Sequence, residues 1–499
     1  MFKLNEDILF LVIEKLKDDS KSLFSCLMVN KLWCENTIPI LWRNPWSYDI
    51  DYYNDNNYLF TIIISYLSDD IKEFLIRQGI QLPSPSISPQ SLSFDYLSFC
   101  KSINIIIINI IISIKTSLIY NQFLLQQEFY KLFMKKCSEL IYLNMKSIKH
   151  QIYYFPDANN RLETLYELEC DTSIDSSYYY GLARICKCIQ RIIIFNVNPK
   201  DNHGIAKLIE VQKNLKYFEW NDDFKNIDFT YDPYEEILFE LEKKTNILKH
   251  LKIFLHYVDN FERSLLLLQN VLMKLNGLKT LMGDFSIFGE HEMKMLYFNN
   301  LEILHIDCIT LIEASIIIEN SGGKLKEVSI KPYDFVYYED NFSEDTLIFI
   351  RKIYQKCPLI EVLSLAFSLS KDHFIEFENL LKICQNLKSL LLFTSNFHIR
   401  ETEEKILESG EEILKILISS ASNNLREIRF FNNFKFSLGT LENFLENWRG
   451  RPALSILTSS TIYEEEDYKN LIDDYKNDGV IKTFKYESVI NVENMNFRI

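Results

Sequence analysis

The chain has 499 residues, 47% of them hydrophobic and 25% charged, a balance typical of folded proteins that excludes disorder over most of the length. Its formal net charge of −15 argues against a nucleic-acid ligand, because binding to a phosphate backbone depends on clustered Lys and Arg. The length exceeds what one small core needs, so we expect several domains or an elongated repeat structure.

Ten cysteines are spread along the chain without the regular spacing of a disulfide framework. Residues 1–7 include Lys, Asn, Glu and Asp in place of the uninterrupted apolar region of a secretory signal. We therefore expect free thiols in a reducing compartment, the cytoplasm, the nucleus or both. Cys186 and Cys188 are too close for a zinc knuckle and have no second pair nearby, so we expect no metal site.

The first 46 residues are expected to form three short helices. The first helix should cover residues 5–16, with Asn5 as its N-cap and two acidic residues in its first turn. Its middle, residues 8–13, is apolar on every side, and a helix without a polar face must be covered from more than one direction. A segment this short has too little chain to supply all the cover. Part of it should come from the following domain or from another protein.

The order and spacing of these residues resemble an F-box. The matching positions are residues 4–9, Ile13, Leu16, Leu23, Cys26, Val29, Asn30, Leu32, Trp33 and residues 41–43. Asp18 and Asp19 match the aspartate that the family often has before its second helix. The family usually has proline where Asn5 stands, and proline pre-shapes the turn into the first helix, so the partner contact should be weaker here.

The resemblance implies that this module docks onto the Skp-type adaptor of a cullin–RING ubiquitin ligase. The adaptor-binding candidates that it implies are Leu4, Ile8, Leu9, Ile13, Leu16 and Leu23. It also implies that Trp33 pins the three helices together, with Leu41 and Trp42 in the same core. The alternative is an N-terminal helical cap in which all of these residues serve only as core.

The most apolar stretch, residues 103–114, contains Asn104, Asn109 and Ser113 and is bracketed by lysines. It is shorter than the about twenty residues that a membrane-spanning helix needs. We therefore expect a buried helix or strand there, and no membrane partner.

From about residue 137 onward, a pattern recurs in which an apolar residue is followed three and five residues later by two more. Clear copies begin at Leu140, Ile189, Leu215, Leu248, Leu301, Leu325, Ile360, Leu387, Leu425 and Ile481, with weaker copies near Leu162, Leu278 and Leu454. Most spacings are near the leucine-rich-repeat period of about 20–29 residues. Helix-like segments lie between copies, and a repeated strand–helix unit buries its leucines only by stacking on the next unit.

The sequence therefore predicts an α/β protein. It comprises an F-box-like module at 1–46, a helical linker with a Pro/Ser loop at 47–130, and a curved leucine-rich-repeat solenoid at 131–499, with a parallel inner sheet and outer helices. A doubly wound α/β fold is the alternative, although that fold seldom needs so many copies. Cys137, Cys357 and Cys384 each precede a copy by three residues, and we expect them to be packing residues.

Between the apolar positions of each strand, the alternate residues should face the concave surface of the array. The candidates for binding a protein target there are His305, Lys331, Phe393, Arg429 and Phe431. Aromatic and Arg side chains are the favoured anchors of protein interfaces.

No hydrolase, zinc-protease or phosphate-loop motif occurs in the sequence, so we expect neither an enzyme nor a cofactor. The expected function is that of a substrate-recognition adaptor of a cullin–RING ubiquitin ligase. The alternative is a protein-interaction scaffold with an F-box-like cap that never joins a ligase.

Overall fold

A computed structural model of the chain describes residues 5–48, 58–83, 92–200, 202–224, 231–332, 342–394, 402–432 and 434–486. The chain divides into two compact units, residues 1–241 and 242–499. Both units are α/β, and their paired strands are parallel and follow one another in chain order. The predicted α/β class with a parallel sheet is confirmed, and the arrangement is compatible with a repeat solenoid. The predicted boundaries near residues 46 and 130 both fall inside the first unit and stay predictions.

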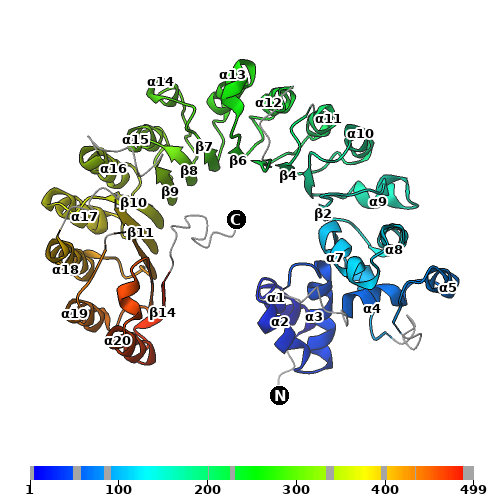
Figure 1. The fold of residues 1–499 in the computed structure, drawn as a ribbon, viewed down its shortest axis with the longest axis horizontal. Helices are drawn as coiled ribbons and strands as arrows, with labels where there is room; N and C mark the ends of the chain where they lie inside the picture. The colour runs from blue at the N-terminus through cyan, green and yellow to red at the C-terminus, as the bar shows by residue number, and fades with distance from the viewer. Residues whose placement is uncertain are drawn as a thin grey trace. The chain divides into compact units, whose positions relative to one another are not determined.

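The first unit begins with helices and continues as alternating strands and helices (Figure 1). Its helices are α1 (Glu6–Glu14), α2 (Ser20–Leu27), α3 (Lys31–Arg43), α4 (Tyr58–Ser65), α5 (Asp69–Arg77), α6 (Tyr96–Phe99), α7 (Ile105–Lys115), α8 (Ile119–Lys136), α9 (Ala158–Leu162), α10 (Ser176–Ile185), α11 (His203–Val211) and α12 (Glu235–Glu242), the last reaching the unit boundary. Its strands are β1 (Ser102–Asn104), β2 (Tyr142–Asn144), β3 (Glu167–Asp171), β4 (Arg191–Asn196) and β5 (Tyr217–Asp222).

Each of the first three helices begins at a polar residue whose side chain accepts a hydrogen bond from a backbone N–H of the first turn. Asn5 accepts from Asp7 N at 3.2 Å, Asp19 from Ser22 N at 3.1 Å, and Asn30 from Trp33 N at 3.1 Å. Such caps satisfy backbone donors that have no partner inside the helix. The three helices predicted for the first 46 residues are therefore present, and the first begins after the N-cap Asn5 that the sequence indicates.

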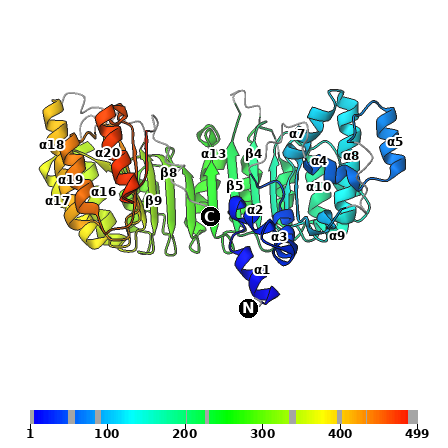
Figure 2. The ribbon, with the colours of Figure 1, turned by 90° about the horizontal axis from the view of Figure 1, so that it is seen from below.

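The second unit repeats strand and helix throughout. Its strands are β6 (His250–Phe254), β7 (Thr280–Asp284), β8 (Ile303–Ile309), β9 (Glu327–Pro332), β10 (Val362–Phe367), β11 (Ser389–Thr394), β12 (Glu427–Phe431), β13 (Leu454–Thr458) and β14 (Ile481–Tyr486). Its helices are α13 (Glu262–Lys274), α14 (Glu290–Met293), α15 (Leu311–Glu319), α16 (Phe342–Lys356), α17 (Lys371–Ile383), α18 (Glu403–Ser420), α19 (Leu438–Trp448) and α20 (Glu466–Asn477). Figure 2 shows strands β8 and β9 side by side and running in the same direction.

The apolar positions of the sequence pattern form ladders across the strands. In the first unit, Leu143, Leu168, Ile192 and Phe218 are neighbours in register, and none is more than 1% exposed. The corresponding ladder of the second unit is Leu251, Leu281, Leu304, Val328, Leu363, Leu390, Ile428 and Ile456, none more than 3% exposed. Every clear copy of the pattern leads into a strand because these ladders form the core between sheet and helices.

The apolar stretch at residues 103–114 forms strand β1 and helix α7, with Ile105, Ile108 and Ile112 buried. The expectation of a buried helix or strand is confirmed. None of the helices within the described residues is long and apolar enough to cross a membrane.

Candidate functional site

Helix α1 divides its apolar residues between two faces. Leu9 and Ile13, four residues apart, are 1% and 0% exposed, and the helix packs against α3. Ile8, Leu11 and Val12 are 52%, 64% and 48% exposed and share the other face by the three- and four-residue spacing of a helix. We call these three residues the α1 stripe. Exposed apolar side chains gathered on one helix face are typical of an interaction surface.

The adaptor-binding candidates separate accordingly. Ile8 is exposed, Leu16 is half-buried, and Leu9, Ile13 and Leu23 are buried inside the module. Leu4 lies outside the described residues. We therefore correct the roles of Leu9, Ile13 and Leu23 to core residues, because side chains packed inside their own module cannot contact an adaptor.

Leu41 and Trp42 are 5% and 6% exposed, as expected of core residues, and Trp42 packs on Tyr96 with ring centroids 4.7 Å apart. Trp33 is only half-buried. A bidentate ion pair also joins α1 to α3. The Arg43 guanidinium donates to both carboxylate oxygens of Glu14, at 2.6 and 3.0 Å. Trp33 is therefore not the buried pin of the module that the resemblance implied.

Helix α2 and the turn after it add exposed apolar side chains to the same module. Phe24 is 43% exposed, Met28 86% and Val29 55%. Phe24 makes an edge contact with Tyr48, at 6.2 Å between ring centroids, which leaves part of its surface accessible.

The target-binding candidates on β11 and β12 are buried. Phe393 and Phe431 are each 1% exposed, and Arg429 is 2% exposed. The expectation that they form an exposed patch is therefore wrong. The burial patterns of β10, β11 and β12 give the reason: nearly every position is buried, so both faces of these strands are covered and not the helix side alone. In register, Leu391 lies beside Arg429, and Phe393 lies beside Phe431.

The other two target-binding candidates keep contact with solvent. Lys331 on β9 is exposed, and the His305 side chain on β8 is 20% exposed. Burial, with a smaller contribution from Lys252, lowers the pKa of His305 to about 4. Burial also raises the pKa of Glu327, whose Oε2 lies 3.8 Å from His305 Nε2. His305 is therefore neutral at physiological pH and does not pair with Glu327 as a cation.

In the first unit, a cluster of charged and aromatic side chains lies on the strand face opposite the leucine ladder. The Arg191 guanidinium lies 3.5 Å from the centroid of the Tyr217 ring, and its Nε is 3.1 Å from Glu167 Oε1. Tyr217 donates a hydrogen bond to Glu219 at 2.5 Å. Burial raises the pKa of the Glu167 carboxyl, with Arg191 opposing that shift.

A second part of this cluster surrounds Lys146, after β2. Its Nζ lies 2.5 Å from Glu169 Oε1 and 3.9 Å from the centroid of the Phe195 ring. Tyr142 donates to the other oxygen of Glu169 at 2.7 Å. No residue of the cluster was among the five target-binding candidates from sequence, although the alternation along the strand predicts that Tyr217 and Glu219 share the face opposite the ladder. The signal that could have found its strand residues is the repeat register itself, because Tyr142 and Arg191 each directly precede a ladder residue.

The described residues contain no group of three or more His, Cys, Asp and Glu side chains placed to hold a metal ion. Cys137, Cys357 and Cys384 are buried, as predicted for packing residues. Burial raises the pKa of Cys357 and of Cys384 to about 12, which keeps both as unreactive thiols.

No protein-family model matches the chain, and no curated protein is significantly similar to it.

Proposed function

We propose that this chain is the substrate-recognition subunit of a cullin–RING ubiquitin ligase. In this proposal, the N-terminal helical module acts as an F-box that docks onto a Skp-type adaptor, and the strand–helix units act as leucine-rich repeats that bind a protein target. The observation that carries the proposal is the α1 stripe. Ile8, Leu11 and Val12 face solvent on a helix whose opposite face, with Leu9 and Ile13, is already packed in the module.

The size of the stripe indicates how much of the affinity it could supply. Fully burying an aliphatic side chain stabilises by about 1.5–3 kcal/mol, and these three side chains are already about half buried. Covering them would therefore contribute about 2–4 kcal/mol, whereas micromolar affinity needs about 8 kcal/mol. Phe24, Met28 and Val29 supply further apolar surface in the same module, so we propose that they extend the docking face.

The mechanism of such a subunit is proximity. It makes and breaks no covalent bond, and it raises the effective concentration of a target lysine near a ubiquitin-loaded enzyme. We place the target contact of the second unit on β8 and β9, where Lys331 is exposed and His305 and Asp307 are partly exposed, and not on the buried faces of β11 and β12.

The test of this function is binding between the purified full-length chain and a purified Skp-type adaptor, measured by isothermal titration calorimetry and by co-elution with the adaptor–cullin complex. The proposal expects a complex of one chain per adaptor that also recruits cullin. A folded chain that binds no adaptor at concentrations of about 100 μM, equivalent to about 5.5 kcal/mol, would instead favour the scaffold with an F-box-like cap.

A further inference from the structure

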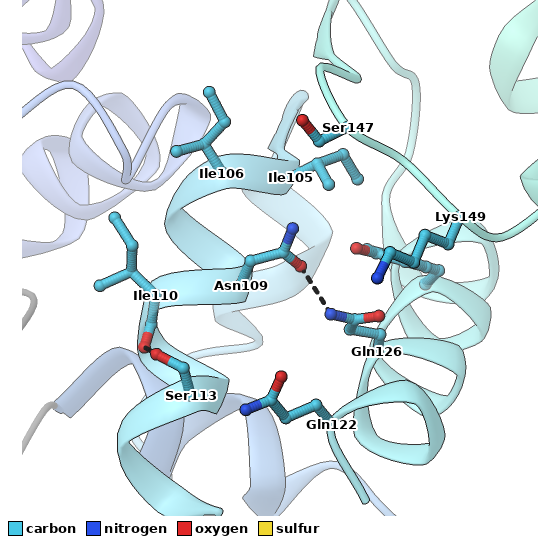
Figure 3. Close-up of a pocket in the computed structure, with 10 residues that line it drawn as sticks. Ile105, Ile106, Asn109, Ile110, Ser113, Gln122, Gln126, Ser147 and Lys149 are labelled. Atoms are coloured by element: carbon cyan, nitrogen blue, oxygen red, sulfur yellow. Dashed lines mark hydrogen bonds between the residues drawn. The ribbon is translucent and has the colours of Figure 1, made fainter. Parts of the chain in front are cut away.

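A groove in the first unit runs between helices α7 and α8 and is bounded by the loop that follows β2 (Figure 3). Its volume is about 450 Å³, within the range of about 300–1,000 Å³ that is common for ligand sites. The polar side chains that line it are Asn109, Ser113, Gln122, Gln126, Ser147 and Lys149. Neither the N-terminal module nor the target-binding candidates contribute to this lining.

Two amide side chains face each other across the groove. Asn109 and Ser113, four residues apart, are the two polar positions of α7 before its last residue, Lys115, and share one face of the helix. Asn109 Oδ1 accepts a hydrogen bond from Gln126 Nε2 of α8 at 2.8 Å (Figure 3). The opposite face of α7, with Ile108 and Ile112, is buried, so the polar face is the one turned toward the groove.

This amide pair leaves hydrogen-bonding capacity in the groove. Within the part of the chain that the structure describes, Asn109 Nδ2 and Gln126 Oε1 make no further hydrogen bond. One donor group and one acceptor of the pair therefore remain open, and these are the groups that complement a C=O and an N–H of a peptide backbone. Ile106 and Ile110 of α7 line the same groove and offer apolar contact along its length.

Lys149 gives the groove its charge. It is exposed, it is the one ionised side chain among the described residues that line the groove, and it forms no ion pair with any of the described residues. Among its described lining residues, the groove therefore presents a cation and no anion, in a chain whose net charge is −15. Such a lining favours an anionic group at this end.

The loop that presents Lys149 is held in place by contacts on both sides. Ser147 has the left-handed backbone conformation (φ 59°), and its N–H donates to Asp171 Oδ2 at 2.8 Å. His150 stacks on Phe123 with ring centroids 3.9 Å apart and accepts a hydrogen bond at its backbone oxygen from Tyr178, at 2.9 Å. A non-glycine residue holds such a conformation only where its surroundings impose it, so the loop is ordered before a ligand arrives.

We propose that this groove binds an extended acidic peptide segment of a partner protein. Asn109 Nδ2 donates to a backbone C=O of the peptide and Gln126 Oε1 accepts from a backbone N–H. Ile106 and Ile110 contact apolar side chains of the peptide, and Lys149 faces an Asp or Glu. A small carboxylate only accepts hydrogen bonds, so it would leave the acceptor Gln126 Oε1 and the two isoleucines without a role. The proposal does not depend on adaptor docking by the N-terminal module.

The test uses the purified full-length chain and a positional-scanning library of acetylated hexapeptide amides. We expect Asp and Glu at one position to be enriched roughly 2–5-fold over Asn and Gln, the discrimination that a partly exposed ion pair provides. Lys149→Met should abolish that enrichment, whereas Lys213→Met, at an exposed lysine of the same unit, should leave it unchanged. Gln126→Met should weaken all peptides by roughly 3–10-fold, because it removes a backbone contact.

Three results would overturn the proposal. One is a library without acidic enrichment at any position, and another is enrichment that persists unchanged in Lys149→Met. The third is full competition by N-acetylglutamate amide at the same concentration as the hexapeptides, which would make the groove a small-carboxylate site. Thermal unfolding of each variant separates loss of binding from loss of fold. Because Lys149→Met changes an exposed side chain, it should fold normally, and the test holds even if Gln126→Met is unstable.

Discussion

Replacing Phe431 by alanine should destabilise the second unit by about 3–5 kcal/mol, the usual cost of emptying a site filled by a buried aromatic ring. Phe431 ends β12, is 1% exposed and lies beside Phe393 in register. For a unit of this size, each kcal/mol corresponds to about 2–4 °C, so the midpoint of thermal unfolding should fall by about 6–20 °C. A Phe431 that faced solvent on an open strand surface would give almost no change.

The second unit offers a selective probe for this measurement. Trp448 is the only tryptophan of the sequence within residues 242–499, so the 19F resonance of 5-fluorotryptophan at this position reports on the unfolding of that unit. The resonance is assigned by its loss from the spectrum of Trp448→Phe. Lys331→Ala, at an exposed position of β9, is the matched control and should shift the midpoint by less than about 2 °C. A Phe431→Ala protein that unfolds within the range of this control would refute the assignment of β12 as buried on both faces.

Three further predictions follow from local packing and charge. Gly410→Ala should destabilise the second unit by about 1–3 kcal/mol, because the Cβ of the new alanine would lie 2.1 Å from the Lys435 backbone oxygen. Gly439→Ala is the control, because a Cβ there would have no atom within 4 Å, and it should stabilise α19 by about 0.5–1 kcal/mol. Burial lowers the pKa of His305 to about 4, so protonation favours the unfolded chain, and stability should be lost as pH falls from about 6.5 toward 4. In urea unfolding, His305→Gln should show a weaker loss over that range than the unmodified chain. Trp42→Ala should cost about 3–5 kcal/mol and expose residues 5–48 to protease cleavage, and a resistant variant would contradict its place in the core.

The strands were predictable from sequence because their signal is local and repeated. Each ladder residue, such as Leu304 or Leu363, stands at a fixed spacing from the next apolar position, and burying it requires a strand packed on helices. The period therefore indicates both the strand positions and their parallel order. The same argument accounts for the early helices, whose caps at Asn5, Asp19 and Asn30 are local hydrogen bonds.

Surface assignments were less predictable because they depend on what covers a face from far along the chain. The alternation along β11 and β12 correctly places Leu392 and Phe430 on one face of the strands and Phe393 and Phe431 on the other. It cannot reveal that this other face is also covered. In α1, an all-round apolar sequence gives no sign of which face turns inward.

Pairings between distant segments were equally hidden. The Asn109–Gln126 contact, for example, joins two helices whose relative placement no local pattern specifies.

The most direct test of the central claim compares adaptor binding by two matched double variants of the full-length chain. Ile8→Glu with Leu11→Glu changes two exposed residues of the α1 stripe, and Lys17→Glu with Lys21→Glu places two charges of the same sign at exposed sites outside it.

Charges in a desolvated contact cost several kcal/mol, so the stripe variant should lose 100-fold or more in affinity for a Skp-type adaptor, on the order of 3 kcal/mol. Its thermal unfolding should match that of the unmodified chain, and the lysine variant should keep its affinity within about threefold. A folded stripe variant that binds the adaptor as tightly as the unmodified chain would contradict the assignment of this face as the docking surface.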